Sequence, residues 1–162
     1  MKIKNLIIGL TLSLLMGSGL AVSADFGKGL SAAQSGDFKT ALAEFTTLAE
    51  QGNARAQAKL GDYYNFGNGV PKNQKAAVRW YMKASKQGDS YAQKELGWKY
   101  YKGSGVLTDY RQAYMWWDIS AFNGHRFSMG LKEEITKEMT PADISKAQNM
   151  SSRCLKSHYT DC

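Results

Sequence analysis

Side chains able to perform acid–base or nucleophilic chemistry are few and scattered in this chain of 162 residues. An imidazole base would have to come from His125 or His158, and Glu133-Glu134 is the one adjacent acidic pair. Adjacent helix positions point about 100° apart, so these two carboxylates do not converge on one substrate atom. The sequence contains no S-x-x-K, H-E-x-x-H, G-x-S-x-G or Walker-type loop. We therefore expect no catalytic residue, no metal site and no cofactor.

The two cysteines, Cys154 and Cys162, have neither C-x-x-C nor zinc-finger spacing. In an oxidising compartment such a pair predicts a disulfide. The bridge would hold the last residue of the chain against the final helix.

The first residues have the layout of a secretory signal peptide. Lys2 and Lys4 precede an apolar run, Leu6 to Met16, and Val22-Ser23-Ala24 has the small residues of a signal-peptidase cleavage site. We expect cleavage after Ala24 and a periplasmic or secreted bacterial protein. The alternative is an uncleaved anchor, but the run is shorter than the ~20 residues that span a bilayer, and we expect no membrane span after cleavage.

Charge narrows the choice of partner only slightly. The residues after Ala24 include 19 basic and 14 acidic side chains, a net charge of +5. This balance fits solubility, with anionic lipid or wall polymer as the alternative partner. Nucleic acid is not expected for a chain addressed out of the cytoplasm.

An internal repeat of 36 residues organises the chain. Gln51-Gly52-Asn53 returns as Gln87-Gly88-Asp89, and in outline as Asn123-Gly124-His125. Eight further residues recur at the same step: Ala56, Gln57, Leu60, Gly61, Tyr64, Gly67, Gly69 and Val70 match Ala92, Gln93, Leu96, Gly97, Tyr100, Gly103, Gly105 and Val106. Repeats of this length are typical of stacked helical arrays.

Each unit is predicted to be a pair of helices, at about 53–66 and 74–87. Gly67-Asn68-Gly69 would end the first helix, and Asn73 (Asp109 in the next unit) would cap the second. Gly61 lies beside the apolar stripe and predicts close approach of a neighbouring helix backbone. Thr140-Pro141 begins a final helix whose apolar side is Ile144, Ala147 and Cys154.

These patterns predict about eight helices in an all-α, right-handed solenoid of three to four helix pairs with a C-terminal capping helix. The expected parts are a signal peptide at 1–24, an N-terminal capping helix pair at 25–52, two full repeats at 53–124, and a C-terminal half-repeat and capping helix with the disulfide at 125–162.

The pattern A-Q-x-x-L-G-x-x-Y-x-x-G-x-G-V resembles the Sel-one-like repeat, a relative of the tetratricopeptide repeat. It matches Ala56–Val70 and Ala92–Val106, and the family's following D/N-x-x-x-A-x-x-W/Y-Y/W matches from Asn73 and Asp109. The resemblance implies an adaptor that holds proteins together. A cysteine-rich branch of the family is linked to β-lactam binding or hydrolysis, but it repeats a cysteine pair that this chain lacks.

The same resemblance implies that the first helix of each pair lines the concave side of the solenoid. One row of positions on these helices does not keep the residue types that recur every 36 residues. It contains both charged residues and large aromatic residues. In the two full repeats it consists of Arg55, Lys59, Asp62, Phe66, Tyr91, Glu95, Trp98 and Lys102. We interpret this row, centred on Trp98, as the binding site of a peptide or protein partner in the cell envelope.

Two other functions stay open at this point. Exposed aromatics and positive charge would suit a wall glycan or peptidoglycan. An envelope hydrolase, β-lactamase-like or otherwise, is the third reading, although the sequence offers no residues to assign to it.

Overall fold

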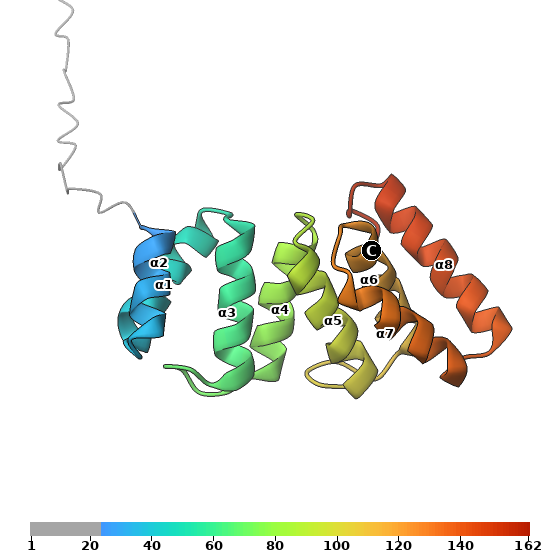
Figure 1. Ribbon diagram of the computed structural model, residues 1–162, viewed down its shortest axis with the longest axis horizontal. Coiled ribbons are helices and arrows are strands. Elements are labelled where there is room, and N and C mark those ends of the chain that lie inside the picture. Colours follow the sequence, from blue (N-terminus) through green and yellow to red (C-terminus); the bar gives the residue numbers. More distant parts are fainter. Residues whose placement is uncertain (1–23) are drawn as a thin grey trace, which may run out of the picture.

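The computed structural model describes residues 24–162, and in this range the chain consists of helices and turns without a strand (Figure 1). The predicted leader, apart from Ala24, lies outside the described residues. The helices are α1 (Phe26–Gln34), α2 (Phe38–Glu50), α3 (Ala54–Phe66), α4 (Gln74–Ser85), α5 (Ser90–Lys102), α6 (Tyr110–Phe122), α7 (Phe127–Ile135), the 3-10 helix η1 (Thr136–Glu138) and α8 (Pro141–Lys156). The expectation of an all-α solenoid is confirmed.

Helix pairs follow one another along the long axis of the molecule, from α1 and α2 at one end to α8 at the other (Figure 1). Each of α3 and α5 packs against its own partner, α4 or α6, and against the second helix of the preceding pair. We call α1, α3, α5 and α7 the first helices, and α2, α4 and α6 the second helices. Three apolar clusters succeed one another through the stack, so each pair buries a face that it could not bury alone.

Local sequence signals set where the helices begin and end. The side chains of Asn53, Asn73 and Asp89 each accept an N–H of the first turn of the following helix. Gly67 and Gly103 end α3 and α5 in the left-handed conformation, with φ of 84° and 65°, which costs glycine little.

The repeated glycine of the first helices makes room for an aromatic ring. A Cβ on Gly61 would lie 2.4 Å from the Tyr81 ring, and one on Gly97 would lie 2.2 Å from the Trp117 ring. The prediction that a helix backbone approaches Gly61 was therefore wrong in its partner. What enters the space is the side chain that the repeat places on the second helix.

Buried amides tie consecutive pairs together. Gln57 donates from Nε2 to the carbonyl oxygen of Ala49 at 3.0 Å, and Gln93, one repeat later, makes the same bond to Ser85 at 3.0 Å. Each of these carbonyls also accepts the backbone N–H of Gly52 or Gly88, so the amide supplies a second donor to the same oxygen.

The C-terminal end differs from the regular pairs. Helix α8 begins at the Thr140 cap, packs against α6, and buries Ala147 and Cys154. A disulfide joins Cys154 to Cys162, as the sequence predicted. Among residues 24–162, no helix has both the length and the apolar character needed to cross a membrane.

Candidate functional site

The predicted row lies along three hollows between successive first helices. Arg55, Lys59 and Tyr91 line the first hollow, of about 330 Å³, together with Phe26 and Leu30 of α1. Cations and aromatic rings therefore share this surface, which joins α1, α3 and the start of α5.

The second hollow, of about 430 Å³, lies between the C-terminal halves of α3 and α5. Phe66, Glu95, Trp98 and Lys102 of the row line it. The side chain of Phe66 is 65% exposed, so a partner could contact its ring.

Trp98 also borders a third, narrow hollow of about 70 Å³ between α5 and α7. Leu131 and Glu134 of α7, which lie one repeat after Glu95 and Trp98, line it as well. The indole of Trp98 is half-buried and packs edge-on against Trp117 and Tyr101, with ring centroids 5.2 and 5.6 Å apart. It therefore belongs partly to the core as well as to the row.

The carboxylate of Asp62 lies between helices α3, α4 and α5 and is hydrogen-bonded there. Its Oδ1 accepts hydrogen bonds from the Tyr81 and Tyr91 hydroxyls, at 2.8 and 2.7 Å, and Lys59 lies 3.6 Å from Oδ2. This carboxylate joins α3 to α4 and α5. Burial, and then the negative charge of Asp62, raise the pKa of both tyrosines well above the usual value.

Cations of the chain itself cover one face of several aromatic rings beside the hollows. Arg55 lies 4.6 Å from the ring centroid of Phe26, Lys94 4.4 Å from that of Tyr91, and Lys102 4.9 Å from that of Trp98. Such pairs stabilise the side chains in place. They also leave fewer free aromatic faces than the sequence suggested.

The sequence prediction missed five polar residues that line the second hollow: Asn65, Lys72, Gln74, Lys99 and Ser104. Lys99 Nζ donates to Asn65 Oδ1 and, at 2.6 Å, to Gln74 Oε1. The sequence did contain a signal for Lys99, because a lysine stands where the repeats before and after it have Tyr63 and Ile135.

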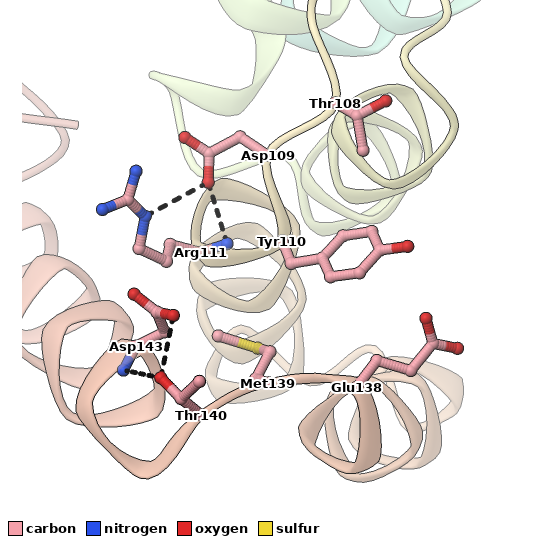
Figure 2. A pocket seen from close by; sticks show the side chains of 8 residues that line it. All are labelled: Thr108, Asp109, Tyr110, Arg111, Glu138, Met139, Thr140 and Asp143. Atoms are coloured by element: carbon pink, nitrogen blue, oxygen red, sulfur yellow. Dashed lines mark hydrogen bonds and ion pairs between the residues drawn. The ribbon is translucent and has the colours of Figure 1, made fainter.

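Another hollow, of about 510 Å³, lies where α6 and α8 begin (Figure 2). Its polar groups are largely committed to helix starts. Asp109 accepts from the backbone N–H of Arg111 and lies 3.5 Å from the Arg111 guanidinium, while Thr140 and Asp143 bond to each other. We assign this hollow to helix capping.

Two other candidates for acid–base chemistry, His125 and Glu134, already contact partners within the protein. His125 Nδ1 lies 3.3 Å from the hydroxyl of Ser128, but Ser128 is fully buried and also bonds Ser120 at 2.8 Å. Glu134 pairs with Lys137 at the surface at 2.5 Å. Among residues 24–162, no group of three or more His, Cys, Asp or Glu side chains is placed to hold a metal ion.

Known proteins similar to this chain place it among repeat proteins. The family model described as "Sel1 repeat" matches residues 54–89 and 90–125. Sel1 repeats are generally protein–protein interaction modules. No curated protein matches the chain.

Two solved structures share the fold. The chain is 30% identical to c5321, a protective antigen of uropathogenic Escherichia coli with an SLR fold, at a TM-score of 0.76 over 81% of this chain. It is 31% identical to a Sel1 repeat protein from Oxalobacter formigenes, at a TM-score of 0.67 over 70% of this chain. It spans only 30% and 47% of those two chains. This protein is therefore an SLR-fold solenoid with two Sel1 repeats at its centre.

Proposed function

We propose that this protein is an exported, non-enzymatic interaction module of the cell envelope that holds a peptide or protein segment along its first helices. The observation that carries the proposal is the succession of hollows across α1, α3, α5 and α7, lined by the polar–aromatic row. An extended segment can contact several of these hollows at once, because they follow one another across neighbouring helices. Export itself rests on the leader pattern of residues 1–24.

The surface chemistry favours a peptide over a wall glycan. A sugar ring stacks on an open aromatic face, whereas Lys94 and Lys102 cover one face of Tyr91 and Trp98. A peptide can instead use the exposed Phe66 edge, the neighbouring charges and the narrow clefts between helices.

The test is a selection of phage-displayed random peptides on the purified protein. Two exposed row residues are changed together, Arg55→Ala and Phe66→Ala. The matched control is Arg79→Ala with Phe122→Ala, which removes the same two side-chain types from exposed positions on the second helices. Selected peptides should bind the row variant at least about tenfold more weakly than wild type, the size of a modest hot spot.

The control variant should bind those peptides like wild type. No enrichment of any peptide, or equal losses in both double variants, would remove the proposed function. Retention on purified peptidoglycan that depends on Arg55 and Phe66 would transfer the site to a glycan.

A further inference from the structure

The junction between α3 and α5 is chemically unlike the junctions on either side of it. Three repeat-equivalent positions meet at each junction: one near the end of a first helix, one at the start of its second helix, and one on the next first helix. Asn65, Gln74 and Lys99 occupy these positions at the central junction, and Tyr101, Tyr110 and Ile135 occupy them at the last, while Phe38 and Tyr63 occupy the second and third positions at the first junction. Only the central set is polar throughout.

The flanking sets pack as apolar contacts. Phe38 and Tyr63 meet edge to face with ring centroids 6.1 Å apart, and Tyr101 stacks on Tyr110 at 5.5 Å. A packed alternative to the polar set is thus already present twice in this chain. Packing between repeats therefore does not require Asn65, Gln74 and Lys99.

A lysine at position 99 is unfavourable for the stability of the fold. Its side chain is as buried as its equivalents, with 6% of the residue exposed against 4% for Tyr63 and 2% for Ile135. Burial lowers the pKa of Lys99, and the charges of Lys72 and Lys102 lower it further, against the opposing effect of Glu95. Burying an ammonium destabilises a fold unless it is well paired.

The pairing of Lys99 is incomplete. An ammonium has three donors, and the described residues supply acceptors for two of them, Asn65 Oδ1 and Gln74 Oε1, neither of which is charged. Gln74 Oε1 also accepts from the Ser104 hydroxyl at 2.8 Å. The amides hold the ammonium beside the hollow, and no carboxylate of the described residues lies within ion-pair distance of it.

The hollow beside Lys99 adds positive charge at this junction. It is lined by Lys72, Lys102 and Ser104, whose equivalents one repeat later are Thr108, Glu138 and Thr140. One acid, Glu95, shares the lining, and it already pairs with Lys94 at 2.7 Å. One repeat later these positions are divided between the narrow hollow of about 70 Å³ and the hollow of about 510 Å³ where α6 and α8 begin, and Glu138 occupies the position of Lys102.

We propose that the hollow formed by Asn65, Lys72, Gln74, Lys99, Lys102 and Ser104 is a carboxylate subsite that receives an acidic side chain of the bound peptide. This inference rests on the proposed peptide-binding function and specifies its partner. The carboxylate accepts the free donor of Lys99 and lies between Lys72 and Lys102, while the next apolar residue of the peptide contacts Phe66 and Trp98.

The test repeats the peptide selection with a variant in which the central junction takes the residues of the last one: Asn65→Tyr, Gln74→Tyr and Lys99→Ile. Peptides joined to the phage coat protein through their C-termini present only side-chain carboxylates. Wild-type protein should enrich peptides with an Asp or Glu beside an apolar residue, and the junction variant should still enrich peptides but without the acidic preference.

A second variant keeps the junction core intact and guards against misfolding of the first. Lys72→Gln with Lys102→Gln changes two exposed lysines of the hollow. Lys75→Gln with Lys86→Gln makes the same charge change in α4 and at its C-cap. A synthetic selected peptide should lose about tenfold in affinity for wild type when its acid is changed to the amide. That loss should shrink in the Lys72/Lys102 variant and persist in the Lys75/Lys86 control.

The outcomes separate the two proposals. If no peptide is enriched by any form, the proposed function fails and this subsite fails with it. Enrichment that depends on Arg55 and Phe66 but shows no acidic preference overturns the subsite alone. An acidic preference that survives in both the junction variant and the Lys72/Lys102 variant overturns it as well.

Discussion

At the scale of single residues, a glycine inside α3 and another inside α5 decide how closely the helices of these pairs approach. Gly97 faces the indole of Trp117, which is also fixed by a hydrogen bond from Nε1 to the carbonyl oxygen of Lys94 at 3.1 Å. The ring cannot move away without breaking that bond. Glycine is ordinarily unfavourable in the middle of a helix, so its presence here reflects the ring.

We predict that Gly97→Ala destabilises the protein by about 1–3 kcal/mol, the usual cost of overpacking a core. The matched control is Gly130→Ala in α7, where an added Cβ would meet nothing within 4 Å. That change should stabilise the protein by about 0.5–1 kcal/mol through helix propensity. Urea unfolding of both variants measures the difference, and equal effects would contradict the packing argument.

At the scale of elements, the carboxylate of Asp62 connects three helices. It accepts hydrogen bonds from the hydroxyls of Tyr81 on α4 and Tyr91 on α5. Hydrogen bonds to a charged group inside a protein are stronger than those between neutral groups. Asp62, which the sequence analysis assigned to partner binding, therefore also connects neighbouring helix pairs.

The raised pKa values of Tyr81 and Tyr91 make this connection sensitive to alkali. Because the folded state favours the neutral phenols, their contribution to stability is complete below about pH 10, the ordinary tyrosine pKa, and is lost as pH rises above it. Each tyrosine should add a slope of about 1.4 kcal/mol per pH unit above that point.

We predict that Tyr81→Phe costs about 1.5–3 kcal/mol at pH 7 and flattens the alkaline slope by one tyrosine. Tyr91→Phe serves as the companion variant, since the same carboxylate holds both hydroxyls. Unfolding free energies measured from pH 7 to 11 test this. Curves that stay parallel to wild type above pH 10 would show that the phenols do not titrate with unfolding.

At the scale of the whole molecule, a short stack must protect its two ends. Helix α8 covers α6, and the segment after it turns back so that Tyr159 donates to Asn123 Oδ1 at 3.0 Å. The Cys154–Cys162 disulfide closes this segment. A stack of so few repeats gains much of its stability from such end caps.

We predict that Cys162→Ser lowers the free energy of unfolding by about 2–3 kcal/mol, from the loop-closure entropy of a short disulfide loop. Cys162 is the better choice for substitution because Cys154 is fully buried. Thermal unfolding with and without dithiothreitol provides the control, since reductant should lower the Tm of wild type to that of the variant. A wild-type Tm that does not respond to reductant would contradict the prediction.

Much of this architecture is encoded in short-range signals that can be read along the chain. The caps at Asn73 and Thr140, the left-handed Gly67 and the apolar stripes depend on neighbours within a few residues. Their recurrence every 36 residues then predicts stacking, because every pair has the same face to bury. The disulfide was predictable in the same way, from two cysteines and the leader pattern.

The candidate site is different, because it forms between helices that are distant in sequence. Spacing indicated which row does not keep the recurring residue types, but only the tertiary structure placed Asp62 between two hydroxyls and Trp98 partly in the core. Likewise, Asn65, Gln74 and Lys99 come from α3, α4 and α5 and converge only when the pairs stack. The sequence by itself determined the helices and their repeat, since these follow from local contacts. The polar junction and its hollow were decided by how the pairs pack, because burial and pairing of a charge are properties of the assembled stack.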